Sequence, residues 1–206
     1  MTLGRSVQGR AIDAVHISTA GARRTVLVVG CVHGNEPAGI AVARRLERSR
    51  RRGLDLWVID DLNPDGLAAR TRQNAHRVDL NRNFPERWRP LGQPGDQQYS
   101  GPHPLSEPEV RIAYTLIRRV KPVVSIWFHQ PVDVVDESGG DLAVERRFAK
   151  LSGLPLRRLT RYPGSAVGWQ NAALYGTTAF VVELPPGRLA SGDVRRYARA
   201  VLGVAR

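Results

Sequence analysis

The 206-residue sequence has a single cysteine, Cys31, so it can form neither an internal disulfide nor a cluster of thiolate metal ligands. It also has no apolar run of the roughly 18 residues that a membrane-spanning helix needs. The first ten residues lack the apolar segment of a secretory signal, which predicts a cytoplasmic protein without membrane contact. Aromatic residues make up only 6% of the chain, and no basic stretch alternates with them as single-strand nucleic-acid binding would require.

Lysine is also scarce, although the chain is strongly basic. It has 31 basic against 19 acidic residues and a net charge of +12, yet Lys121 and Lys150 are its only lysines. Such a charge suggests an anionic partner such as nucleic acid. The densest arginine run, over 44–52, instead falls at the end of a predicted helix, where cations suit the helix dipole. We therefore predict a solvated arginine surface and no nucleic-acid partner, and keep a basic nucleic-acid binder as an alternative.

The order of predicted elements indicates the fold class. Three apolar runs, over 25–32, 122–128 and 177–184, are typical of strands buried on both faces. Ser106 and Glu109 form a capping-box pattern that predicts a helix to about residue 120. Further strands are predicted over 10–18, 54–60 and 156–160, and further helices over 37–50, 142–152, 169–174 and 193–202. This alternation predicts one domain, residues 1–206, built as a three-layer α/β/α sandwich around a mixed, largely parallel sheet.

Polar residues follow the three apolar runs. His33 and Glu36 come just after the first, His129 just after the second, and Glu183 lies at the end of the third. Ligands of open α/β sheets gather at the carboxyl ends of strands, and catalytic zinc takes three protein ligands with one open position. His33, Glu36 and His129 could supply those ligands, with Glu183 left as a base. From spacing alone, a hydrogen-bonded loop pair explains His33 and Glu36 equally well.

More specific motifs lie along the chain, one of them in an irregular stretch over 73–108. The chain contains His33-Gly-Asn-Glu36, Asn63-Pro-Asp-Gly66 and Asp79-Leu-Asn-Arg-Asn-Phe-Pro85 in that order. With these motifs the sequence resembles the M14 zinc carboxypeptidases, and most closely the compact bacterial branch that includes murein peptide amidases. The resemblance runs over nearly the whole chain. It implies the zinc carboxypeptidase-like fold and one zinc ion per chain.

The resemblance also implies a role for each residue near the metal. His33, Glu36 and His129 match the zinc ligands, and Glu183 matches the general base. Asp79 matches the acid that orients the first histidine. A carboxylate commonly accepts the second N–H of a metal-bound imidazole.

Three further residues match groups that contact the substrate. Arg72 matches the arginine that polarises the scissile carbonyl. Asn81 and Arg82 match the pair that binds the terminal carboxylate, which an arginine fork can grip with two hydrogen bonds. The digestive members of the family also have a mobile tyrosine, but Tyr162 stands too close to the Gly-Ser segment for that role to be assigned to it. Side-chain specificity is expected to involve residues 164–170.

The expected function is zinc-dependent hydrolysis of an amide bond next to a free carboxylate, in a small peptide of murein origin. One alternative is an N-acyl amino acid deacylase of the aspartoacylase or succinylglutamate desuccinylase type, which shares the fold and the ligand spacing. Another is a zinc- or peptide-binding module without turnover. The Asn81-Arg82 pair favours the peptidase over the deacylase, and Glu183 favours an enzyme over a binding module.

Overall fold

A computed structural model describes residues 1–22, 24–49 and 52–205. Its centre is a seven-stranded sheet in the order β3-β5-β4-β6-β9-β7-β8, and a separate hairpin pairs β1 with β2. The strands are β1 (Thr2–Arg5), β2 (Ala11–Asp13), β3 (Val15–Ser18), β4 (Thr25–Val29), β5 (Asp55–Ile59), β6 (Val124–His129), β7 (Val134–Asp136), β8 (Leu156–Arg157) and β9 (Thr178–Glu183). Strands β5, β4, β6 and β9 are parallel. Strand β3 pairs antiparallel with β5, and β7 pairs antiparallel with β9 and parallel with β8. The predicted mixed, largely parallel sheet is confirmed.

Helices cover both faces of this sheet and complete the three layers. One core contains side chains of α1 (Ala38–Glu47), α4 (Leu142–Ser152) and α6 (Ser191–Val204). The other contains side chains of α3 (Pro108–Val120) and α5 (Ala166–Ala173). A short helix α2 (Pro64–Ala69) and a 3-10 turn (Leu80–Arg82) lie in the connection between β5 and α3. No helix among the described residues is long and apolar enough to cross a membrane.

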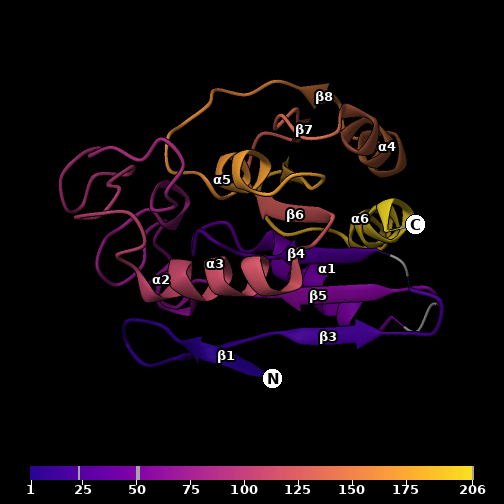
Figure 1. Ribbon diagram of the computed structural model, residues 1–206, viewed down its shortest axis with the longest axis horizontal. Coiled ribbons are helices and arrows are strands. Elements are labelled where there is room, and N and C mark those ends of the chain that lie inside the picture. Colours follow the sequence, from indigo (N-terminus) through magenta and orange to yellow (C-terminus); the bar gives the residue numbers. More distant parts are fainter. Residues whose placement is uncertain (23, 50–51, 206) are drawn as a thin grey trace.

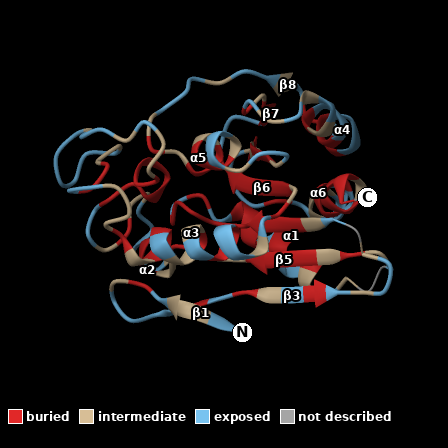
Figure 2. Cartoon of the chain, viewed as in Figure 1, coloured by how far each residue is buried: buried red, intermediate tan, exposed pale blue. Residues whose placement is uncertain are grey.

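The central strands place polar residues at one end of the sheet. Most side chains of the central strands are apolar and buried because helices pack on both faces of the sheet, as the red strands of Figure 2 show. The arrowheads of β5 and β6 point toward the same end of the molecule, where the irregular segment between α2 and α3 gathers in Figure 1. This end is therefore where the residues that follow each strand come together.

The predicted capping box at Ser106 and Glu109 is wrong. Helix α3 begins at Pro108 after Glu107, and its first turn has no side-chain cap. The Ser106 hydroxyl donates instead to the Glu107 carboxylate over 2.7 Å. Glu109 is drawn toward the N-terminal segment, where its Oε1 accepts from the Val7 backbone N–H over 3.1 Å. Ser106 therefore bonds to its neighbour in the sequence and Glu109 to a distant segment, and neither makes the reciprocal cap that the pattern predicted.

Other differences are local. The Asn63-Pro-Asp-Gly66 motif forms the start of α2, because the Asn63 side chain accepts from the Gly66 N–H over 2.9 Å and caps the helix. The strand predicted over 10–18 is divided into β2 and β3. Strand β7 is not among the predicted strands. Most predicted strands and helices are present with boundaries shifted by a few residues, and the helix over 142–152 has the predicted ends.

Candidate active site

His33, Glu36 and His129 meet at the carboxyl end of the sheet. His33 and Glu36 lie in the tight turn after β4, where the Glu36 backbone N–H donates to the His33 carbonyl over 2.9 Å. His129 is the last residue of the neighbouring strand β6. All three are buried. Glu36 Oε2 lies 3.0 Å from His33 Nδ1 and 3.0 Å from His129 Nδ1, so one atom from each residue faces a common point.

This arrangement fits a metal ion. The two Nδ1 atoms of His33 and His129 face each other across 3.1 Å, and at most one hydrogen atom can lie between them. At least one imidazole therefore presents a lone pair to the centre, beside a carboxylate oxygen. The separations of 3.0–3.1 Å are close to the edge, about 3.3 Å, of a tetrahedron with zinc–ligand bonds of about 2.0 Å. Two nitrogens and one oxygen are also the donors that catalytic zinc takes.

Asp79 holds the ring of His33 from the far side. Its Oδ1 lies 3.0 Å from His33 Nε2 and also accepts from the Asn81 backbone N–H over 2.9 Å. Burial by itself would lower the pKa of His33, but Asp79 and Glu36 outweigh it and raise that pKa above its ordinary value. The contact fixes Nε2 as the nitrogen that faces Asp79, so Nδ1 is the one available to a metal.

Glu183 lies beside this cluster and keeps one carboxylate oxygen unused. It ends β9, where it is in register with His129 of β6. Its Oε2 is buried and has no hydrogen-bond partner among the described residues. Burial raises the pKa of Glu183 above its ordinary value, and the charge of His129 opposes that shift. A carboxylate held in this way is suited to exchange a proton with a group placed between it and the cluster.

Arg72 links the cluster to Asp79. Its Nε donates to Asp79 Oδ2 over 2.9 Å, and its Nη1 donates to Glu36 Oε1 over 2.8 Å. The remaining terminal nitrogen, Nη2, has no partner among the described residues. The side chain is 22% exposed and lines the cavity over the cluster. The guanidinium is thus fixed at two points and keeps donor capacity for a ligand.

Arg82 is a buried cation in the same cavity. It forms no ion pair within the described ranges, and its Nε has no hydrogen-bond partner there. Its Nη1 donates to the Asn81 carbonyl over 2.8 Å, and the guanidinium carbon lies 4.2 Å from the centre of the Tyr162 ring. Asn81 is held in turn by the Ala166 N–H, which donates to its Oδ1 over 2.9 Å. A buried, unpaired arginine is suited to bind an anion that enters the cavity.

The cavity over these residues has a volume of about 300 Å³. Every predicted site residue except Asp79 lines it, and Tyr162 lines it as well. Its lining also includes residues that were not predicted, among them Gln130 and Asp136. Asp136 is buried and its Oδ2 accepts from Arg161 Nη1 over 2.7 Å. No local signal in the sequence indicates Asp136, because the sequence pattern does not predict β7, the strand that carries Asp136 into the site.

The chain is similar in sequence to a known family of enzymes. Residues 1–135 match the Peptidase M14 family, described as zinc carboxypeptidase. The chain belongs to this family. It is 31% identical over 184 residues to murein peptide amidase A of Escherichia coli K12, which covers 81% of this chain and 74% of that one. It is 32% identical over 198 residues to murein peptide amidase A of Vibrio campbellii, with 89% and 78% covered.

A solved structure also agrees with the fold. The murein-tripeptide amidase of Escherichia coli O157 superposes with a TM-score of 0.78 at 26% identity, and the match covers 100% of this chain and 91% of that one. The resemblance predicted from the motifs is therefore confirmed. The protein is a hydrolase of the M14 family, whose members depend on zinc, and His33, Glu36 and His129 form a possible metal site.

Proposed function

We propose that the protein is a monozinc amidase that cleaves a small murein-derived peptide next to a residue with a free carboxylate. The observation that carries this proposal is the convergence of His33, Glu36 and His129 beside Glu183, whose Oε2 has no partner among the described residues. The names of the related amidases support the substrate class. The proposed setting is the cytoplasm.

In this proposal His33, Glu36 and His129 hold one zinc ion per chain. Zinc at such a site lowers the pKa of a bound water and polarises a carbonyl group. Asp79 keeps the His33 ring oriented toward the metal. Glu183 takes the proton from the attacking water and later returns it to the leaving amine.

The remaining residues act on the substrate. Arg72 donates to the carbonyl oxygen of the scissile bond as negative charge develops on it in the transition state. Arg82 binds the carboxylate of the leaving residue, and Asn81 supports Arg82 through its carbonyl. The bond to be cleaved then lies between Arg82 and the ligand cluster, within reach of Glu183.

The proposal is tested by metal content and turnover together. Purified wild-type protein is expected to contain about one zinc per chain by elemental analysis. Glu183→Gln is expected to keep that zinc and lose turnover by about 10² to 10⁴-fold, the usual contribution of a general base. His129→Ala is expected to lose the zinc itself. Normal turnover in Glu183→Gln would show that another residue is the base.

A substrate comparison separates the amidase from a deacylase of the same fold. The wild-type protein is incubated with γ-glutamyl-diaminopimelate peptides and, in parallel, with a panel of N-acyl amino acids, and the products are read by mass spectrometry. Cleavage of the peptides supports the proposal. Cleavage confined to the N-acyl amino acids would replace it with the deacylase function.

A further inference from the structure

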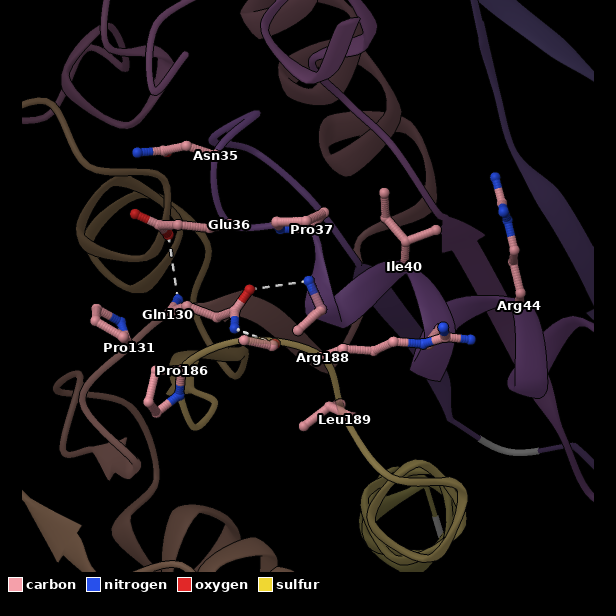
Figure 3. A pocket seen from close by; sticks show the side chains of 13 residues that line it. Asn35, Glu36, Pro37, Ile40, Arg44, Gln130, Pro131, Pro186, Arg188 and Leu189 are labelled. Carbon is pink, nitrogen blue, oxygen red and sulfur yellow. Dashed lines mark hydrogen bonds between the residues drawn. The ribbon is translucent and has the colours of Figure 1, made fainter. Parts of the chain in front are cut away.

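A second, larger cavity adjoins the catalytic one. This groove has a volume of about 850 Å³ and shares Glu36 and Gln130 with the catalytic cavity. Its walls come from the start of α1, from the residues after β6 and from the segment after β9. Figure 3 shows Glu36 and Gln130 toward one end of the groove, Arg44 and Arg188 toward the other, and Ile40 between them. The groove is therefore a continuation of the active site and not a separate pocket.

Gln130 ties the walls of the groove together. Its Oε1 accepts from the Ala38 N–H over 3.0 Å at the start of α1. Its Nε2 donates to the carbonyls of Pro185 and Gly187, over 2.8 and 2.9 Å, in the segment after β9. Figure 3 shows the side chain bridging these segments. Because these bonds are already formed, the groove exists before any ligand binds, which reduces the entropic cost of binding.

The position of the groove indicates which part of the substrate it receives. This step rests on the proposed function, in which Arg82 holds the leaving residue. Arg82 lines only the catalytic cavity, whereas Glu36 lines both cavities. A peptide anchored at Arg82 with its reacting carbonyl beside Glu36 would continue on its acyl side into the groove.

The far end of the groove is positively charged. Glu36, at the opposite end, is the only carboxylate among the lining residues. Arg44 is 63% exposed, and its Nε donates to Asp60 over 2.9 Å. Such exposed pairs contribute little and leave the cation available. Arg188 has no ion-pair or hydrogen-bond partner within the described ranges. Arg188 and Arg44 are thus two cations at this end of the groove, and Asp60, the acid that pairs with Arg44, does not line it.

We infer that the groove binds the acyl side of the substrate and that Arg44 and Arg188 together bind a carboxylate carried beyond the residue that supplies the scissile carbonyl. The enzyme would then bind the carboxylate of the leaving residue at Arg82 and this more distant acyl-side carboxylate at the two arginines of the groove. Pro37, Ile40 and Leu189 supply the apolar wall between the cluster and the two arginines.

The test uses two peptides that differ by one charge. L-alanyl-γ-D-glutamyl-diaminopimelate is capped at its N-terminus with succinate or with the methyl ester of succinate. A second pair lacks the alanine, so that the carboxylate is offered at two distances. For at least one pair, the zinc-loaded wild type is expected to cleave the acid with a kcat/KM about tenfold higher, mainly through KM. A charge-assisted contact present in ground and transition states has this effect.

Variants decide whether the two arginines cause the preference. In R44A/R188A the ratio of kcat/KM between acid and ester is expected to fall to about one. R118A/R199A removes the same charge from exposed positions outside the groove and is expected to keep the wild-type ratio. Equal kcat/KM for acid and ester in the wild type, or an unchanged ratio in R44A/R188A, would overturn the inference.

A binding measurement separates this inference from the proposed function. Affinities of both capped peptides for the zinc-loaded Glu183→Gln variant are measured by titration calorimetry, with and without the two arginine substitutions. The acid is expected to bind about tenfold more tightly only when both arginines are present. If the wild type cleaves neither peptide, the proposed function fails, and the affinity ratio still decides whether Arg44 and Arg188 bind a carboxylate.

Discussion

Arg72 shows how much of the site depends on a single side chain. Its guanidinium spans Glu36 and Asp79, so it touches both a candidate metal ligand and the acid that orients His33. The same group also lines the catalytic cavity. Arg72 therefore has two proposed roles, one in the electrostatics of the cluster and one as a donor to the substrate. An experiment can separate them.

Arg72→Ala is expected to keep zinc and lose kcat by roughly 100-fold, the scale for removing one donor to a developing oxyanion. Zinc is retained because His33, Glu36 and His129 are unchanged and Asp79 still contacts His33. Elemental analysis and steady-state kinetics on the same preparation measure both quantities. Arg72→Lys serves as the control that keeps the charge without the two-point fork. Wild-type turnover in Arg72→Ala would remove Arg72 from the mechanism, and loss of zinc would make its role structural.

The candidate site was predictable to the extent that its residues stand at strand ends. His129 and Glu183 end buried apolar runs, and the parallel order of β6 and β9 places them in register. Gln130 and Asp136 were not predicted because their positions depend on tertiary contacts. Gln130 reaches α1 and the segment after β9, and Asp136 enters the cavity on a short strand that pairs over long range with β9 and β8.

At the scale of elements, two glycines explain why two motifs belong together. Gly34 lies in the turn after β4, and Gly66 lies in α2. A Cβ added to Gly34 would lie 1.9 Å from the Gly66 carbonyl carbon, so the turn with the metal-ligand pair packs directly on the backbone of α2. Asn63 reinforces the contact, because its Nδ2 donates to the Val32 carbonyl over 3.1 Å.

Gly34→Ala is therefore expected to displace His33 and Glu36 as a unit. Because the clash is with backbone and not with a flexible side chain, the free energy of unfolding is expected to fall by more than about 2 kcal/mol, together with zinc affinity. Urea unfolding and a chelator competition measure the two effects. Gly192→Ala is the matched control: its Cβ would meet nothing within 4 Å in the first turn of α6, and it is expected to be neutral or stabilising by up to about 1 kcal/mol. Equal stability of the two variants would contradict this packing argument.

The fold was predictable where an element has its own periodicity or apolar run, as for α4 and the central strands. It was not predictable where an element is short and held by distant partners. Helix α2 has six residues, two of them proline and glycine, and it is stabilised by the Asn63 cap. Strand β7 has three residues and forms only through pairing with β9 and β8. Local patterns carry too little information for such elements.

Over the whole molecule, the arginines that give the net charge of +12 lie in two kinds of place. Arg72 and Arg82 line the catalytic cavity, and Arg44 and Arg188 line the adjoining groove. Most other arginines lie on exposed surface. The charge therefore surrounds a site whose proposed substrates are anionic, and it is expected to speed their association at low ionic strength.

Two carboxyl groups, one buried and one half-buried, set a further property of the whole molecule, the dependence of its stability on pH. Burial raises the pKa of Glu145 to about 7 and that of Asp61 to about 6. In the unfolded chain these groups ionise near pH 4. Between about pH 4 and pH 7 the folded state binds more protons than the unfolded state. The contribution of these two protonated carboxyl groups to stability is therefore complete below about pH 4 and is lost as pH rises toward 7.

Glu145→Gln tests this directly. Glu145 Oε1 accepts from the Ser138 N–H over 3.0 Å, and a glutamine carbonyl can accept the same bond without a charge. The variant and the wild type are compared with zinc bound; the variant is expected to have a higher Tm at pH 8, where wild-type Glu145 is ionised in its buried position, and the difference is expected to shrink at pH 5, where Glu145 is neutral in the folded state. Glu137→Gln, a half-buried neighbour, controls for the change in net charge. A Tm difference independent of pH would show that Glu145 does not titrate in this range.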